Sequence, residues 1–152
     1  GPVISTFSCG AVYSPVLAPS SVDVLIVMEI SEVLRPDFLS LLKPDGTIIF
    51  NNFSVLPGTA KKEDYPDINK IYEGLKDYRV IKIDANKIAQ NLSDVNGKTA
   101  NVVVLGVLST IAPFCYIQEN IWLLALMEIS HSEFMKSANK ISFEKGRETV
   151  NK

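Results

Sequence analysis

Two apolar runs of this sequence each end at a polar side chain that could bind a ligand. The run from Val22 to Met28 stops at Glu29, and the run from Thr47 to Phe50 stops at Asn51. Short runs rich in β-branched residues are typical of strands that are buried on both faces. In parallel α/β sheets, ligands meet the carboxyl ends of the strands. Glu29 and Asn51 are therefore candidate ligand-binding residues.

A second pair of candidates lies near the start of a long apolar stretch, which we expect to be a helix from Thr99 to Ile111. Lys98 precedes this stretch and Asn101 lies in its first turn. The first turn of a helix presents unpaired N–H groups, so Lys98 could bind an anion there. Asn101 could hydrogen-bond a neighbouring loop or point outward to a ligand. Lys98 could equally be a solvated loop residue, and Glu29 a cap for the helical turn that follows it.

Other catalytic patterns are missing from the sequence. It contains no glycine-rich dinucleotide fingerprint, no phosphate-binding loop, no nucleophile elbow and no cysteine–histidine cluster. The single histidine, His131, stands near the start of a polar helix, where we expect it to be solvated. Cys9 and Cys115 are far apart and lack metal-ligand spacing, so we expect reduced thiols.

Composition excludes several further classes of protein. The 152 residues are 47% hydrophobic and 21% charged, which is ordinary for one soluble domain. A net charge of -2 and a pI near 5.4 disfavour nucleic acid as a partner. The longest uncharged apolar run, Thr99 to Ile117, is interrupted by Gly106 and Pro113, so we expect a buried helix and no membrane span. No secretory signal is visible, and we expect a cytoplasmic protein.

The candidate residues must be positioned by an α/β fold. The two apolar runs are separated by a connection long enough to cross over, so we expect them to be parallel strands. The sequence predicts a three-layer α/β domain with a mostly parallel, Rossmann-like sheet, an N-terminal hairpin and C-terminal helices. The expected strands are a pair at Val3 to Ser8 and Val12 to Leu17 around Gly10, and single strands at Val22 to Met28, Thr47 to Phe50 and Val80 to Ile83. Helical turns are expected at Ile30 to Leu34 and Phe38 to Leu42, and helices from Pro66 to Leu75, Asp84 to Asn91, Thr99 to Ile111, Gln118 to Glu128 and Glu133 to Arg147. Loops are expected at Phe53 to Tyr65 and Asp94 to Lys98.

Several segments, taken together and in their order along the chain, resemble a known family. The chain is similar to the gamma-type domain of 2-oxoacid:ferredoxin oxidoreductases, and the likeness is greatest to the beta subunit of indolepyruvate oxidoreductase. The resemblance covers nearly the whole chain, so we expect residues 1–152 to form a single domain of this type. The segments are Val12 to Leu17, Asp23 to Glu29, Leu41 to Ile49, Ile83 to Ala85, Ile88 to Ala89, Asn101 to Leu108 and Ser137 to Gly146.

The resemblance implies an oxidative decarboxylation of a 2-oxoacid, from which an acyl-coenzyme A is made. Thiamine diphosphate and the iron–sulfur clusters would be held by partner subunits, one of them thiamine diphosphate-binding and another ferredoxin-type. The resemblance implies no cofactor in this chain itself. It also implies that this domain lies on the coenzyme A side of the enzyme. The glycine loop with which the family domain normally begins is not found in this sequence. Without that unit, we expect the isolated chain to form a homo-oligomer.

Two alternatives stay open from the sequence. The chain could be a stand-alone module that binds coenzyme A or a nucleotide, although the missing glycine loop argues against tight phosphate binding. It could also be a structural interaction domain, docking through the loop from Phe53 to Tyr65 and a sheet edge near Pro15.

Overall fold

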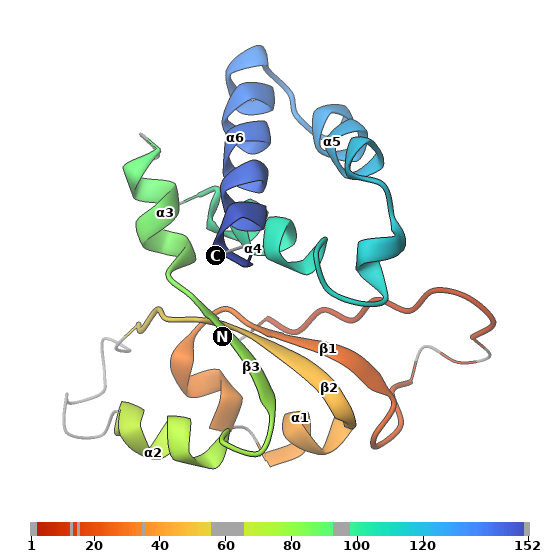
Figure 1. The fold of residues 1–152 in the computed structure, drawn as a ribbon, viewed down its shortest axis with the longest axis vertical. Coiled ribbons are helices and arrows are strands. Elements are labelled where there is room, and N and C mark those ends of the chain that lie inside the picture. The colour runs from red at the N-terminus through yellow and green to blue at the C-terminus, as the bar shows by residue number, and fades with distance from the viewer. Residues whose placement is uncertain are drawn as a thin grey trace.

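A computed structural model describes residues 3–12, 14, 16–34, 36–55, 66–92 and 98–150 of the chain (Figure 1). Three strands and a series of helices alternate along it, and the C-terminal part is helical. In chain order the elements are β1 (Val22–Val27), the 3₁₀ helix η1 (Ile30–Leu34), α1 (Pro36–Leu41), β2 (Leu42–Asn51), α2 (Ile68–Gly74), β3 (Arg79–Ile83), α3 (Ala85–Asn91), α4 (Ala100–Leu108), the 3₁₀ helix η3 (Phe114–Tyr116), α5 (Glu119–Glu128) and α6 (Glu133–Val150).

The three strands form one parallel sheet in the order β1-β2-β3. The predicted parallel arrangement of the two apolar runs is thus confirmed. The predicted start of the second strand at Thr47 is wrong, because β2 begins at Leu42 and Lys43 to Gly46 lie within it. Their partners show why the sequence was misleading: Val22 pairs with Leu42 and Val24 already pairs with Thr47. The segment between Leu42 and Thr47 is an irregularity inside a strand, not a break before it.

Helices cover both faces of the sheet, as the prediction of an α/β fold requires (Figure 1). On one face, Ile48 and Phe50 pack against η1 and α2, with Val33 and Ile71 buried among them. On the other face, Ile49 packs against α3 and α4. Alternate residues of β2 therefore enter two different cores, which explains why this strand is apolar without a break.

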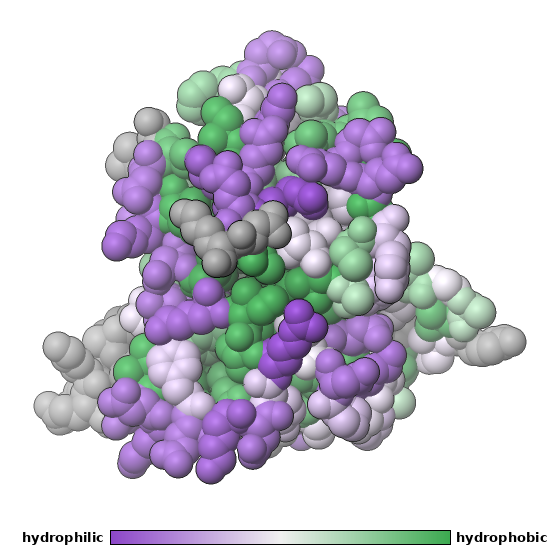
Figure 2. All heavy atoms as spheres, in the orientation of Figure 1, coloured by the Kyte–Doolittle hydropathy of each residue, from purple (hydrophilic) through white to green (hydrophobic). Residues whose placement is uncertain are grey.

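The second core is built around α4, which is buried on nearly all sides. Seven of its nine residues are buried, and α6 packs along it. The predicted buried helix is therefore confirmed. Figure 2 shows apolar atoms gathered between the sheet and the helices above it on this face of the molecule. Among the helices that the structure describes, none is both long and apolar enough to cross a membrane.

The predicted N-terminal hairpin is wrong. Gly10 does make a turn, with φ of 99° and a hydrogen bond from Val12 N to Gly10 O. Residues 3–12 nevertheless form no strand, and their side chains are exposed. A two-stranded pair without a packed apolar face has little to stabilise it. Tyr13 and Pro15 lie outside the described residues.

The remaining helices agree with the sequence to within a few residues. Asp67 caps α2 by accepting a hydrogen bond from Asn69 N at 2.9 Å, and Ile71 and Leu75 are buried. The two expected loops fall partly outside the described residues, since residues 56–65 and 93–97 are not described.

Candidate functional site

Asn51 is the central residue at the carboxyl edge of the sheet. Its side chain is 1% exposed. The amide nitrogen donates to Met28 O at 2.9 Å and to Asn86 Oδ1 at 2.8 Å, and the amide oxygen accepts from Ala85 N at 2.9 Å. Met28 follows β1, Asn51 ends β2, and Ala85 begins the helix after β3. One side chain thus joins the ends of all three strands.

The bond to Ala85 N also makes Asn51 a cap of α3, because that amide is one of the unpaired donors of the first helical turn. The sequence places a common capping residue type, Asp84, directly before this helix. Asp84 stands at the N-cap position but makes no capping hydrogen bond with its side chain. It accepts instead from Asn52 Nδ2 at 2.7 Å. The position of the cap is evident from the sequence but the capping residue is not, because the side chain that accepts from Ala85 N comes from a neighbouring strand.

Glu29 fixes the turn that follows β1. One carboxylate oxygen accepts from Ser31 N at 2.9 Å and also from the Ser31 hydroxyl. The other accepts from Val55 N at 3.1 Å, and Ile30 N donates to Phe53 O at 2.8 Å beside it. The carboxylate therefore makes the bonds of a cap for η1 and also holds the segment after β2. Contact between Glu29 and a ligand stays a prediction.

Lys98 and Asn101 are exposed near the start of α4. The amide oxygen of Asn101 accepts from Val102 N at 2.9 Å, within its own helix. Of the hydrogen bonds and ion pairs found among the described residues, none joins Lys98 or Asn101 to Glu29 or Asn51. The four predicted residues therefore do not form one site. Glu29 and Asn51 belong to the hydrogen-bonded network at the carboxyl edge of the sheet, whereas Lys98 and Asn101 lie at the exposed start of α4.

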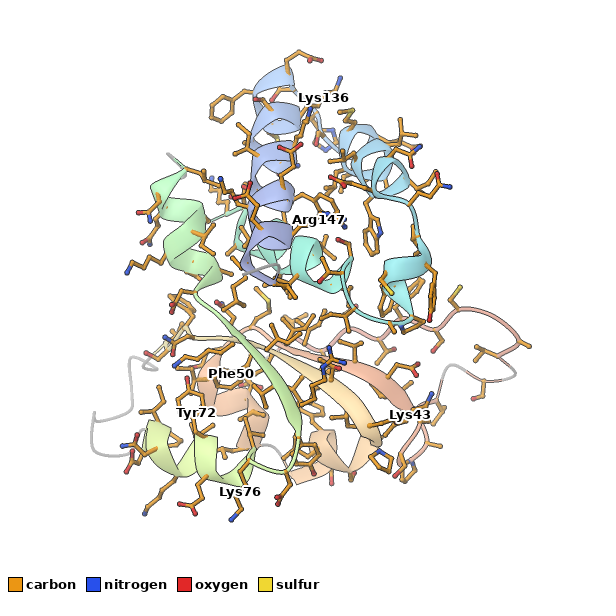
Figure 3. The ribbon with its side chains drawn as sticks, in the orientation of Figure 1. Lys43, Phe50, Tyr72, Lys76, Lys136 and Arg147 are labelled. Atoms are coloured by element: carbon orange, nitrogen blue, oxygen red, sulfur yellow. The ribbon has the colours of Figure 1, made fainter. Side chains whose placement is uncertain are left out.

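A cluster beside the network was missed by sequence reasoning. Lys82 Nζ lies 4.4 Å from the centroid of the Tyr72 ring. The Tyr72 ring meets the Phe50 ring edge-on, with their centroids 5.6 Å apart, and Figure 3 labels both residues. The Tyr72 hydroxyl donates to Asn52 Oδ1 at 3.4 Å. Lys82 is an exposed cation in a strand whose neighbours are apolar, which was the available signal. The cluster extends the polar edge from β2 toward α2.

Another charged pair lies at the opposite edge of the sheet. Lys43 donates to the carboxylate of Asp23, which joins the irregular start of β2 to β1. The hydrogen bond from Lys43 to Asp23, and then the attraction between the two charges, raises the pKa of Lys43. A shallow hollow of about 290 Å³ opens beside the pair, lined also by Arg79 and Tyr116. Its two acidic side chains, Asp23 and Asp45, offset its cations.

The residues present do not fit an iron–sulfur cluster. Such clusters are usually held by four thiolates, and the sequence has two cysteines, Cys9 and Cys115, both exposed. Within the described ranges, His, Cys, Asp and Glu also form no group of three or more that could hold a metal ion. His131 is exposed near the start of α6, as expected.

Comparison with known families agrees with this architecture. Residues 1–149 match the family described as pyruvate ferredoxin/flavodoxin oxidoreductase. The match spans nearly all of the chain, so the chain belongs to this family, and it is a domain or subunit of the 2-oxoacid:ferredoxin oxidoreductase class. A search of curated proteins finds no relative.

Proposed function

We propose that this chain is a non-catalytic domain of a 2-oxoacid:ferredoxin oxidoreductase that acts on indolepyruvate or another arylpyruvate. In this proposal, partner subunits hold thiamine diphosphate and the iron–sulfur clusters. They decarboxylate the 2-oxoacid, pass its electrons to ferredoxin and transfer the acyl group to coenzyme A. The chain is a gamma-type domain that supports this assembly and lies on the coenzyme A side.

The observation that carries the proposal is the family match over residues 1–149. The polar edge of the sheet supports a non-catalytic role. The polar atoms of Asn51 are engaged with Met28, Ala85 and Asn86, and the Glu29 carboxylate is engaged with Ser31 and Val55. Groups engaged in this way hold strand ends and helix starts in place, and they are poor candidates for proton transfer.

Reconstitution tests the proposal. The chain is produced with a thiamine diphosphate-binding subunit and a ferredoxin-type subunit, and the reduction of ferredoxin is followed with a 2-oxoacid and coenzyme A. We expect activity only with all components present, and higher kcat/KM for indolepyruvate than for pyruvate or 2-oxoglutarate. A preference for pyruvate would reject the arylpyruvate assignment alone. No complex and no activity with any such partner would reject the whole proposal.

The isolated chain supplies a second test. After anaerobic reconstitution with iron and sulfide, we expect no visible absorption band in proportion to protein, because two thiolates do not provide the usual set of four. A stoichiometric band would contradict the assignment of the clusters to partner subunits. Calorimetry with coenzyme A addresses the alternative of a free-standing binding module, since tight binding to the isolated chain would favour that alternative.

A further inference from the structure

Helix α5 carries apolar side chains on the face that is turned away from the rest of the chain. Its inner face buries Leu126 and packs against α6 (Figure 1). On its outer face, Ile121 is 51% exposed, Leu124 is 60% exposed and Met127 is 38% exposed. A surface helix normally turns polar residues to the solvent, and a helix that is apolar all round is normally buried. The outer face of α5 therefore has the character of an interface.

This face lies a layer away from the sheet. Helix α5 packs against α6, and α6 in turn packs along α4, which covers the sheet. A strand that extends the sheet therefore does not cover the outer face of α5. A groove of about 720 Å³ opens between α5 and α6 beside this face, and Leu124 and Met127 line its α5 side. The groove gives a partner helix room for side chains next to the apolar residues.

The residues of this face are arranged symmetrically about Leu124. Ile121 and Met127 lie three residues before and after it, and Asn120 and Glu128 lie four residues before and after it. Four residues are about 6 Å along a helix axis, at about 1.5 Å per residue. Asn120 and Glu128 are both exposed, and within the described part of the chain their side chains make no hydrogen bond or ion pair. A helix that pairs with its own copy requires this symmetry, whereas a helix that binds a different protein does not.

We propose that the outer face of α5 binds the same face of a second copy, with the two helices antiparallel and Leu124 at the two-fold axis. In this register Leu124 meets its own copy, and Ile121 of each chain meets Met127 of the other. Asn120 of each chain is level with Glu128 of the other, and an amide N–H group can donate to a carboxylate. A two-fold contact uses the same surface on both copies, so the assembly closes as a dimer. The pairing is independent of the oxidoreductase reaction.

The contact is small, and this sets the affinity that we expect. Helix α5 has ten residues, whereas a standard stable interface buries roughly 800 Å² on each side. We therefore expect a dimer that dissociates at micromolar concentrations. Analytical ultracentrifugation of the chain should show a mass that rises from 16.7 kDa toward twice that value with concentration. A chain that stays monomeric up to about 500 μM, where even weak contacts are populated, would overturn the proposal.

Two matched leucine variants locate the contact. Leu124→Asp places two carboxylates together at the two-fold axis, so we expect the dimer dissociation constant to rise roughly tenfold or more. Leu34→Asp makes the same change at an exposed leucine of η1, which lies on the opposite face of the sheet, and should leave the constant unchanged. Both leucines are exposed, so both variants should keep the circular dichroism of the native chain. Equal effects of the two variants would overturn the proposal.

Charge changes at Asn120 test the antiparallel register. Asn120→Lys places a cation level with Glu128 of the other copy, so it should tighten the dimer severalfold, and added salt should reduce this gain. Asn120→Asp places a carboxylate there and should weaken the dimer. Effects of the two variants in the same direction would contradict the register. If the native chain is monomeric while Leu124→Asp prevents its assembly with the other oxidoreductase subunits, a partner subunit occupies the face and the proposal is wrong.

Discussion

Gly106 of α4 and Gly146 of α6 face each other where these two helices approach most closely. A Cβ atom added to either glycine would lie 3.0 Å from the Cα of the other. It would also overlap a backbone carbonyl oxygen of the facing helix, that of Phe143 or of Val103. Because backbone atoms cannot turn aside as side chains can, the contact between α4 and α6 depends on the absence of both Cβ atoms.

Replacing either glycine should therefore destabilise the fold. We expect Gly106→Ala and Gly146→Ala to lower the free energy of unfolding by about 3 kcal/mol, as overpacking of a well-packed core does, measured by urea denaturation. Gly74→Ala is the matched control. Nothing lies within 4 Å of a Cβ added at Gly74, so this change should be neutral or slightly stabilising. Equal effects at the three glycines would show that helix propensity, and not close approach, governs them.

Asn51→Ala should reduce stability more than any other polar substitution at the carboxyl edge. It removes three hydrogen bonds, to Met28, Asn86 and Ala85, each contributing about 1 kcal/mol, so a loss of about 3 kcal/mol is expected. Thermal and urea unfolding measure it. Asn52→Ala, at a less buried neighbour, should cost under about 1 kcal/mol. Similar losses at the two positions would mean that Asn51 does not join the strand ends in solution.

The variant Asn51→Asp distinguishes the contribution of the amide oxygen of Asn51 from that of its amide nitrogen. The carboxylate can still accept from Ala85 N, but it has no donor for Met28 O and places negative charge beside two oxygen atoms. We expect this variant to be at least as unstable as Asn51→Ala at pH 7. Full stability of the aspartate would indicate that capping of α3 is the whole contribution of Asn51.

The variant Asn101→Ala should reduce the activity of the assembled enzyme more than the stability of the chain. Asn101 is exposed, and within the described part of the chain its side chain bonds the next residue of its own helix, Val102. We expect a loss of stability below about 1 kcal/mol, as for a weak cap, and a clear fall in the activity of the reconstituted oxidoreductase. Steep loss of melting temperature with normal activity would contradict a functional role at the start of α4.

The Lys43–Asp23 pair predicts a dependence on alkaline pH. The hydrogen bond from Lys43 to Asp23 raises the pKa of Lys43 in the folded chain. The stabilisation that this pair gives to the folded state is therefore fully present below the ordinary lysine pKa of about 10.4, and it is lost as pH rises through the higher folded-state pKa. The stability difference between the native chain and Lys43→Met should be constant from pH 7 to 9 and shrink above about pH 10. Lys76→Met is the control, since Lys76 is a more exposed lysine 3.9 Å from Glu73. A difference that grows with pH would contradict the sign.

Much of the fold could be predicted because the information is local. The apolar runs before Glu29 and Asn51 are long enough and bounded clearly enough to identify parallel strands, and Asp67 marks the start of α2 by its position alone. The predicted start of the second strand, after Lys43 to Gly46, was wrong for a physical reason. A proline and a glycine usually end a strand, but pairing with β1 before and after them keeps this segment inside β2.

The site was predictable in position more than in role. Glu29 and Asn51 do lie at the carboxyl edge, as the strand ends required. The side chain of Asn51 is hydrogen-bonded to Met28 and Ala85, which lie 23 and 34 positions away along the chain. The role of Asn51 therefore depends on residues that are distant in sequence. The cluster of Lys82 over Tyr72 likewise joins a strand to a helix that precedes it. Such contacts are set by tertiary packing, which the spacing of residues along the chain does not reveal.

The cap that Asn51 gives to α3 also bears on the order in which the chain can fold. A helix capped from within its own sequence can begin on its own, whereas α3 lacks the side-chain bond of its adjacent Asp84. Its first turn is completed by a residue 34 positions earlier, and that residue is in place only when β2 lies beside β3. Closing a loop of that length costs chain entropy before the helix gains its cap. Helix α3 should therefore consolidate after the sheet, as a late step of folding.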